Sequence, residues 1–232
     1  MKRLGLIGGS SWISTVEYYR HINLMVNARL GGSEYALLTI DSLNFGDVTR
    51  NFSLHDSSGC EKLVVDAAMR LAASDATAIL ICANTLHLYA KAVETATGLP
   101  VIHVAKATAR AVHEKGIHKV ALLGTKKTME MDIYFSILAD LGIECITPSD
   151  GDRHMIDHSI FNELGKGIFT GEKKAEYLKV IEKLQDKGAE GVILGCTEIP
   201  LLLAPEEIPI PSFDTTKIHS TAAVDYMLRI KA

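Results

Sequence analysis

The sequence lacks the features that mark an exported, membrane-bound or nucleic-acid-binding chain. Its 24 Lys and Arg residues are outnumbered by 28 Asp and Glu, so there is no positive excess to drive binding to nucleic acid. No apolar run reaches the roughly 18 residues of a membrane helix, and the short apolar start does not resemble a secretion signal. These absences predict a globular protein that binds neither membrane nor nucleic acid.

Cysteine pairs and nucleotide-binding glycine patterns are missing as well. The four cysteines show neither a CxxC pair nor a metal-ligand spacing, and 232 residues with 47% apolar residues need no disulfide framework. The glycines of Gly8-Gly9-Ser10-Ser11 match neither GxGxxG nor the Walker pattern. We therefore expect a cytoplasmic protein without a metal site or a bound nucleotide.

The chain contains two copies of one sequence pattern. In each copy an apolar run ends at a glycine, and a second apolar run farther along ends in polar residues. The matched segments are 2–9 with 118–125, 78–86 with 191–199, and 99–102 with 208–211. In this register Ala83 matches Cys196, and Cys82 matches Gly195.

Helical patterns separate the predicted strands. Residues 61–73 and 175–187 carry apolar side chains three and four positions apart, which gives each helix one face to lay on a sheet. Strands that alternate with helices predict an α/β fold, here two similar parallel-sheet α/β domains related by an internal pseudo-repeat. The predicted domains are 1–104 with 212–232, and 105–211. A tail helix over 216–229 is expected to return to the first domain.

The polar residues after the predicted strands are the candidate site. Ligands of parallel sheets bind beyond the carboxyl ends of the strands. Four loops fall there, and we expect them around one cleft between the two domains. These loops are Gly8-Gly9-Ser10, Ala83-Asn84-Thr85, Gly124-Thr125 and Cys196-Thr197-Glu198.

Cys196 is the strongest candidate for chemistry in these loops. If a helix begins at Thr197, its unsatisfied amides would favour the thiolate and make the sulfur a base or a nucleophile. The alternative is a buried, inert cysteine.

The neighbouring polar side chains each have two interpretations. Asn84 and Thr85 can hold a carboxylate or simply cap a helix, and Thr125 with Thr128 repeats the arrangement. His87 can orient a ligand or donate a proton, or it can be a packed residue.

Two cations are weaker candidates. Arg50 or Lys166 can pair with a second substrate carboxylate, or each can be solvated at the surface. Residues 33–47 and 55–58 are polar and poorly periodic. A strand is predicted at 35–40, and the stretch 50–59, which begins at Arg50, is expected to form a mobile flap over the cleft.

Four segments together resemble the aspartate/glutamate racemase family. They are Gly-Gly-Ser-Ser at 8–11, Ala-Asn-Thr-Leu-His at 83–87, Leu-Gly-Thr at 123–125 with Thr128, and Gly-Cys-Thr-Glu-Ile at 195–199. The resemblance implies two similar α/β domains, no pyridoxal phosphate, no metal, a small amino-acid substrate and commonly a homodimer. It also implies two cysteines on opposite faces of the substrate Cα, where one removes a proton and the other returns one.

The resemblance assigns roles to individual residues. Cys196 corresponds to one of the two cysteines, and Glu198 to a neighbour that orients the substrate ammonium or tunes the thiol. Asn84, Thr85, Thr125, Thr128 and Thr197 correspond to ligands of the substrate carboxylate and ammonium. Ser10 and Ala83, in the same loops, are also expected to line the substrate site.

The second cysteine of the family is missing. Its position is Ala83, and Cys82 lies one residue earlier, so it should face the other side of the strand unless a bulge turns it inward. Three hypotheses follow. The protein is a racemase or epimerase with water, Thr85 or His87 relaying the second proton; or a one-cysteine decarboxylase of malonate type; or a non-catalytic binder of an acidic amino acid.

Overall fold

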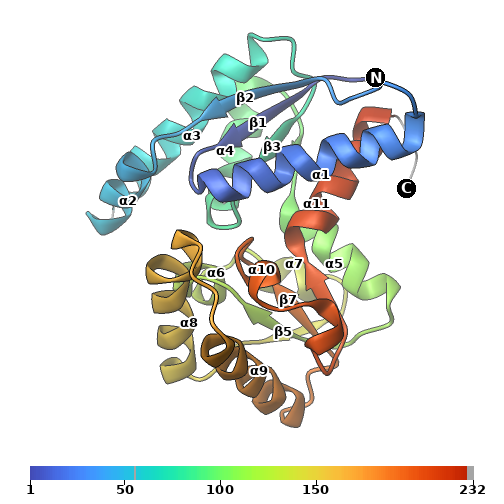
Figure 1. The fold of residues 1–232 in the computed structure, drawn as a ribbon. Helices are drawn as coiled ribbons and strands as arrows, with labels where there is room; N and C mark the ends of the chain where they lie inside the picture. The colour runs from blue at the N-terminus through green and yellow to red at the C-terminus, as the bar shows by residue number, and fades with distance from the viewer. Residues whose placement is uncertain (55, 229–232) are drawn as a thin grey trace. The chain divides into compact units, whose positions relative to one another are not determined.

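The computed structural model describes residues 1–54 and 56–228, which form two compact units (Figure 1). The first unit is Met1–Val104 with the segment from His219, and the second is Ala105–Ile218. The second crossing of the chain therefore follows Ile218, whereas the sequence analysis places it after residue 211. The reason is that residues 212–214 form a strand of the second unit.

Each unit is built on a four-stranded parallel sheet of the same topology. The first sheet has the order β2-β1-β3-β4 and the second the order β6-β5-β7-β8. The strands of the first are β1 (Leu4–Gly8), β2 (Leu38–Ser42), β3 (Ile79–Ile81) and β4 (Val101–Ile102). Those of the second are β5 (Lys119–Leu123), β6 (Glu144–Ile146), β7 (Gly191–Leu194) and β8 (Ser212–Asp214). The predicted α/β fold with two similar parallel sheets is confirmed.

Strand register shows that the two units are copies at the residue level. Leu6 pairs with Leu80 in the first sheet, and their matched residues Leu122 and Ile193 pair in the second. Beyond these pairs, the amide of Cys82 donates to the carbonyl of Ile7 at 2.9 Å, as that of Gly195 donates to Leu123 at 2.7 Å. The next residues along the chain, Ala83 and Cys196, are therefore equivalent.

The third predicted match is wrong by two residues. The carbonyl of Pro100 accepts from the amide of Ile79, and the carbonyl of Pro211 accepts from Val192. Pro100 thus corresponds to Pro211, the second proline of Ile-Pro-Ile-Pro, and not to Pro209. A proline before the edge strand has no amide to donate, so its carbonyl is the group that continues the pairing.

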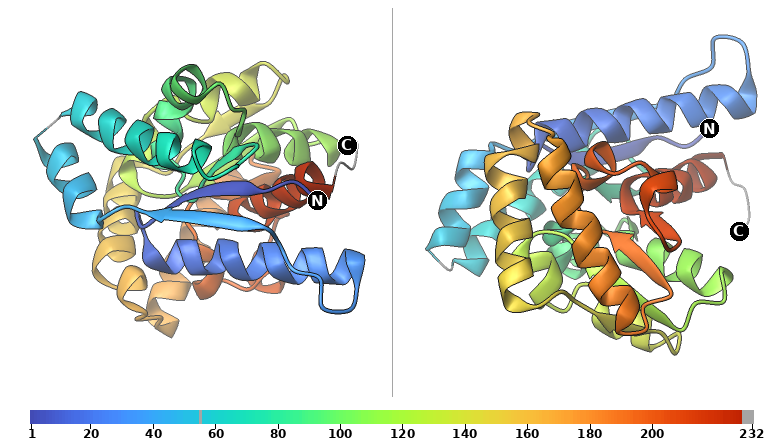
Figure 2. Two further views of the ribbon diagram at one scale, coloured as in Figure 1. Left: turned by 90° about the horizontal axis from the view of Figure 1, so that it is seen from above. Right: turned by 60° about the horizontal axis from the view of Figure 1, so that its bottom comes forward.

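Helices cover both faces of the first sheet (Figures 1 and 2). On one face lie α3 (Ser57–Ala72) and α4 (Ala90–Thr97), which pack on Ile7, Ile79 and Ile81. On the other lie α1 (Trp12–Leu30) and α11 (Thr215–Leu228), which pack on Leu4, Leu6 and Leu80. Alternate residues of one strand therefore belong to different cores, as the two-residue repeat of a strand requires.

Two long helices cover one face of the second sheet. The helices α8 (Asp150–Asn162) and α9 (Gly171–Asp186) pack on Ala121, Leu123 and Leu194. The other helices of this unit are α5 (Val104–Glu114), α6 (Lys126–Glu130), α7 (Phe135–Ala139) and α10 (Ile199–Leu202). Single-turn 3-10 helices are η1 (Thr85–Tyr89), η2 (Leu164–Lys166) and η3 (Pro205–Glu207).

Two local predictions in the first unit need correction. The stretch expected as a flap is mostly helical: α2 (Phe45–Ser53) contains Arg50, and α3 begins at Ser57, while His55 lies outside the described residues. The strand predicted at 35–40 is β2 at Leu38–Ser42. The predicted tail helix is α11, and its expected last residue, Arg229, also lies outside the described part of the chain.

Within the described residues, no helix is long and apolar enough to cross a membrane.

Gly9, directly after β1, is the most constrained glycine of the candidate loops. Its φ is +83°, and a Cβ there would lie 2.0 Å from the carbonyl oxygen of Leu43. We expect Gly9→Ala to lower the free energy of unfolding by about 3 kcal/mol or more, because backbone strain adds to a collision with another backbone segment.

Gly32→Ala is the matched control for this prediction. Gly32 also has a positive φ, +57°, but a Cβ there would meet nothing within 4 Å. Only the conformational cost of about 1 kcal/mol is therefore expected. Urea denaturation of both variants measures the difference, and an equal loss in the two would show that the approach of Leu43 has no effect.

Candidate active site

The candidate loops lie at the carboxyl ends of the two central strands of each sheet. In the second unit, glycines let the ends of β5 and β7 come close together. A Cβ on Gly124 would lie 3.0 Å from the carbonyl oxygen of Gly195, and one on Gly195 would lie 2.8 Å from that of Leu123. The close approach sets Cys196 beside the loop that carries Thr125 and Thr128.

Cys196 and the two residues after it form one hydrogen-bonded group. The thiol of Cys196 donates to Oε2 of Glu198 at 2.8 Å, and the hydroxyl of Thr197 donates to the same oxygen at 2.8 Å. Cys196 is half-buried, whereas Glu198 is only 4% exposed. A buried carboxylate is therefore available to hold the thiol proton in the resting protein.

The environment favours the thiol of Cys196 over the thiolate. Burial raises the pKa of Cys196 well above its ordinary value, and the negative charge and hydrogen bond of Glu198 raise it further. The backbone amides of Thr197 and Glu198 act in the opposite direction but are weaker. The sequence analysis expected a helix at Thr197 to favour the thiolate. Instead α10 begins at Ile199 and has 4 residues, so it offers no substantial dipole.

Thr125 and Thr128 lie together, as the sequence pattern suggests. Their hydroxyl oxygens are 3.0 Å apart, and Thr125 also accepts from the amide of Thr128 at 3.3 Å as the N-cap of α6. Thr128 is buried, with its methyl group against the backbone of Gly195. Thr125 therefore has a capping role in the structure, and a substrate role would be additional.

The equivalent loop of the first unit carries Ala83, Asn84 and Thr85, all half-buried. Asn84 precedes η1 but makes no side-chain capping bond, so capping does not account for this asparagine. Sequence reasoning did not single out Ser14, whose buried hydroxyl donates to the carbonyl of Cys82 at 2.7 Å. In the sequence, the one sign of this contact is the place of Ser14 in the first turn of α1. The hydrogen bond connects α1 to the loop that begins at Ala83. Ser10 is half-buried, directly before Ser11, the N-cap of α1.

Cys82 lies away from the candidate loop. It is 1% exposed and packs with Leu80 in the core beneath α1 and α11, whereas Ala83 packs in the core on the opposite face. Burial raises the pKa of the Cys82 thiol far above its ordinary value. This cysteine is therefore a core residue in the structure.

Both ring nitrogens of His87 are occupied by backbone groups. Nδ1 lies 2.8 Å from the carbonyl oxygen of Ala83, and Nε2 lies 3.2 Å from the amide nitrogen of Val104. Burial lowers the pKa of His87 well below its ordinary value, and the nearby His219 and His103 lower it further. The geometry gives His87 a structural role rather than that of a proton relay.

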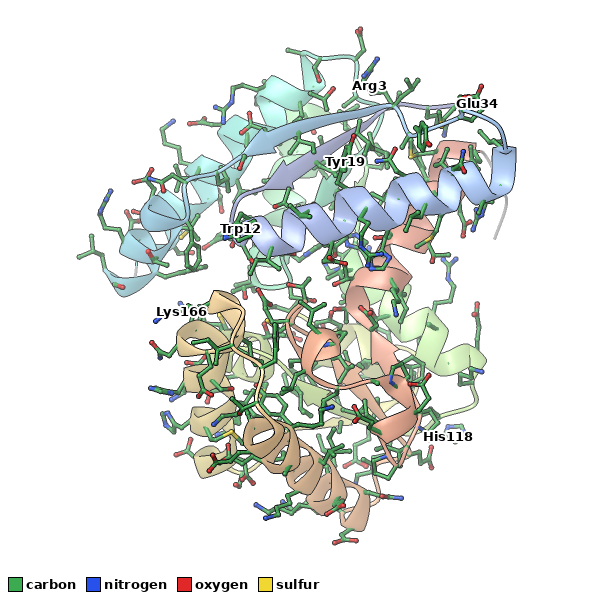
Figure 3. The ribbon with its side chains drawn as sticks, viewed as in Figure 1. Arg3, Trp12, Tyr19, Glu34, His118 and Lys166 are labelled. Carbon is green, nitrogen blue, oxygen red and sulfur yellow. The ribbon has the colours of Figure 1, made fainter. Side chains whose placement is uncertain are left out.

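The two candidate cations lie at the surface of their own units. Arg50 of α2 pairs with Asp47 at 2.8 Å, and its side chain is 67% exposed. Lys166 ends η2 and is exposed (Figure 3). In the described part of the chain, no group of three or more His, Cys, Asp or Glu side chains is placed to hold a metal ion.

The repeated parallel sheets, with one half-buried thiol at a strand end, define an α/β protein with a cysteine-based candidate site. Comparison with known proteins identifies its family. Residues 7–223 match the Asp/Glu/Hydantoin racemase family, and the chain belongs to it.

Solved structures and a curated relative agree with this assignment. A proposed Asp/Glu racemase from Yersinia pestis is 44% identical, with a TM-score of 0.92 over 98% of this chain and 100% of that one. An aspartate racemase homologue from Pyrococcus horikoshii OT3 is 31% identical, with a TM-score of 0.86 over 98% of this chain and 100% of that one. The broad specificity amino-acid racemase RacX of Bacillus subtilis is 21% identical over 173 residues, which is 75% of this chain and 74% of RacX.

Removal of the Glu198 charge should make Cys196 more reactive. We expect Glu198→Gln to lower the pKa of the thiol, because the carboxylate raises it both by its charge and as a hydrogen-bond acceptor. Peptide-resolved alkylation with iodoacetamide should therefore show faster modification of Cys196 at pH 7.5 in the variant. In the unsubstituted protein the rate should still rise with pH above 9.

Glu206→Gln controls for the loss of one carboxylate from the same unit, because Glu206 is exposed. It should leave the rate of Cys196 alkylation unchanged. A Glu198→Gln protein that reacts at the same rate as the unsubstituted one would show that this carboxylate does not govern the thiol.

Proposed function

We propose that the protein is a cofactor-independent racemase or epimerase of a small acidic amino acid, of the aspartate or glutamate class. The observation that carries this proposal is the thiol of Cys196 at the end of β7, hydrogen-bonded to the buried carboxylate of Glu198. A protonated thiol is a suitable acid for a carbanion at an amino-acid Cα, and the family resemblance implies chemistry of this kind.

In the proposed reaction, Cys196 donates a proton to one face of the substrate Cα. A base on the other face takes the Cα proton, and the electron pair of the C–H bond remains on Cα. The S–H proton of Cys196 then passes to the near face of Cα, and its bonding electrons stay on sulfur as a thiolate. One proton has left the substrate and one has arrived, so only the configuration changes. The protonated base then releases its proton to solvent and the thiolate takes one from solvent, which restores the resting state with the thiol beside Glu198.

The loop side chains stabilise the carbanion in this proposal. Without a cofactor to accept electrons, hydroxyls and amides must bind the carboxylate as charge spreads into it. We assign this role to Asn84 and Thr85 of the first repeat and to Thr125, Thr128 and Thr197 of the second. Because the resting thiol is protonated, the favoured substrate enantiomer has its Cα–H on the face opposite Cys196.

The group on that opposite face is the unusual part of the proposal. The repeat places Ala83 where the family has its second cysteine, and Cys82 is buried in the core. Both nitrogens of His87 bond to the backbone, so the second proton passes through water or Thr85. Turnover should therefore be slower than with two thiols, since each acid or base group typically contributes about 10²- to 10⁴-fold.

The substrate class, oligomer and location also belong to the proposal. A dicarboxylic amino acid agrees with the names of the Yersinia pestis and Pyrococcus horikoshii structures. In the proposal its second carboxylate pairs with one of the two surface cations, Arg50, which would leave Asp47, or Lys166. We further propose a homodimer, as the family resemblance implies, and a cytoplasmic location, as expected from the four cysteines without a pairing pattern. Light scattering on the purified protein tests the oligomer.

A one-cysteine decarboxylase of malonate type is the second candidate. The protonated resting state of Cys196, with alanine at the matched position, favours it. Loss of CO₂ leaves the electron pair on carbon, so a single acid completes the reaction without a base on the other face. Release of CO₂ from a substituted malonate would support this alternative.

Incubation with L- and D-aspartate and L- and D-glutamate in D₂O tests the proposal, because Cα deuteration and chirality are followed together. Deuteration with inversion is the expected result. Deuteration with retention would indicate chemistry on one face only. No deuteration of any of the four would contradict the proposal and leave the decarboxylase or a non-catalytic binder.

A further inference from the structure

The first unit contains a buried histidine cluster that the proposed reaction does not use. The ring centroid of His87 lies 4.8 Å from that of His103 and 5.3 Å from that of His219. His87 is 4% exposed and His219 is fully buried. Buried imidazoles need partners for both ring nitrogens, so those partners reveal what each histidine does.

Backbone groups determine the tautomer of His87. The amide of Val104 can only donate, so Nε2 of His87, 3.2 Å away, carries no proton and accepts. Nδ1 therefore carries the proton and donates to the carbonyl of Ala83 at 2.8 Å. His87 is thus a neutral bridge between these two backbone groups.

His219 has the opposite tautomer. The carbonyl of Ile102 can only accept, so Nε2 of His219 carries the proton and donates to it at 2.6 Å. Nδ1 then accepts from the hydroxyl of Tyr18 at 2.8 Å. Burial lowers the pKa of His219 to about 3, which agrees with a neutral ring.

The two imidazoles hold one short segment of the chain. Ile102 and Val104 are the last residues of the first unit before the chain crosses to the second, and His219 is the first residue after it returns. His87 connects this segment to Ala83, where the candidate loop begins. The position of that loop therefore depends on a contact made at the point where the chain leaves the unit.

We propose that His87 is a positioning residue, which holds the loop Ala83–Thr85 in its substrate-binding place by bridging the carbonyl of Ala83 and the amide of Val104. This inference rests on the proposed function, which assigns the substrate to that loop. It gives His87 no acid-base step, and His219 supports the bridge by holding Ile102 in the same segment.

Two amide variants separate the two bonds of His87. Asparagine places an amide nitrogen near the position of Nδ1, so His87→Asn keeps a donor for Ala83 and loses the acceptor for Val104. Glutamine places an amide oxygen near the position of Nε2, so His87→Gln keeps the acceptor and loses the donor. Because the bridge needs both bonds, we expect each variant to raise KM about tenfold with a much smaller change in kcat.

His113→Asn is the matched control, because His113 is exposed on α5. It should leave KM and kcat unchanged. A KM equal to that of the unsubstituted protein in either His87 variant, or a fall in kcat with KM unchanged, would overturn the proposal.

Two measurements decide the proposal without turnover. Nitrogen-15 NMR of the unsubstituted protein should show His87 protonated at Nδ1 and His219 at Nε2 at pH 7. A proton on Nε2 of His87 would overturn the bridge whether or not the variants fold. Amide hydrogen exchange at residues 83–85 should be faster in both His87 variants than in the unsubstituted protein, and unchanged exchange in either variant would contradict the proposal. If no amino acid is deuterated by the unsubstituted protein, the proposed function fails, while these two readouts still decide the role of His87.

Discussion

Cys196→Ser is expected to reduce Cα deuteration of the preferred amino acid by about 10²- to 10⁴-fold, because a serine hydroxyl is a far weaker acid than a thiol. The change removes the proton donor but retains a hydroxyl that can donate to Oε2 of Glu198, as the thiol does. The fold should therefore survive, and thermal unfolding should stay close to that of the unsubstituted protein. Exchange is measured in D₂O by the loss of the Cα–H signal in proton NMR.

Cys145→Ser is the control for this prediction. Cys145 is also a free, half-buried cysteine, but it lies in β6, an edge strand of the second sheet. Its replacement should leave the exchange rate unchanged. A Cys196→Ser protein with undiminished exchange would remove the sulfur from the mechanism.

Ala83→Cys should increase the rate of inversion by about 10²-fold. The matched strand registers place a residue 83 side chain where the repeat has Cys196, so the new thiol replaces water or Thr85 as the second proton carrier. The gain should be in inversion specifically, measured by polarimetry or chiral chromatography. Exchange with retention should become a smaller share of the total.

Ala96→Cys adds a thiol to the same unit at an exposed position of α4, and it should not change the rate. The double variant Ala83→Cys/Cys196→Ser is the sharper test, since it moves the thiol of the candidate loops to the other repeat. It should exchange the opposite enantiomer faster than Cys196→Ser alone does. No gain in either variant would show that the missing cysteine is not what limits turnover.

The sequence was sufficient for the repeat and for the positions of its central strands. Apolar runs that end at glycine are local patterns, and the matched registers of Leu6 with Leu80 and Leu122 with Ile193 follow from them. Strand alternation also predicted that Cys82 would face away from the loop of Ala83, and the structure places it in the core.

Features that depend on side-chain contacts or on backbone pairing were beyond the sequence. The match of Pro100 with Pro211 is decided by which carbonyl continues the sheet, and Ile-Pro-Ile-Pro offers two similar choices. Glu198 lies two residues from Cys196, but only the conformation of the turn brings its carboxylate to the thiol. The pKa of Cys196 is raised rather than lowered because burial, and then this carboxylate, outweigh the backbone amides.

His87 shows the same limit in another form. A histidine after Asn-Thr suggests a reacting group, yet its partners, Ala83 and Val104, are backbone atoms. One of these is brought near by the turn of η1 and the other by the pairing of β3 with β4. Sequence patterns predict helices, strands and their buried faces. Which groups hydrogen-bond to the two ring nitrogens of a histidine depends on where the folded chain places its backbone amides and carbonyls.

Substrate protection of Cys196 tests the central claim most directly. If the sulfur exchanges a proton with Cα, the amino acid that is deuterated in D₂O must cover it. Peptide-resolved alkylation of Cys196 should slow as that amino acid is added, with half-protection at the concentration that gives half-maximal exchange. Alkylation that continues at its original rate under saturating substrate, while Cα exchange proceeds, would contradict the account.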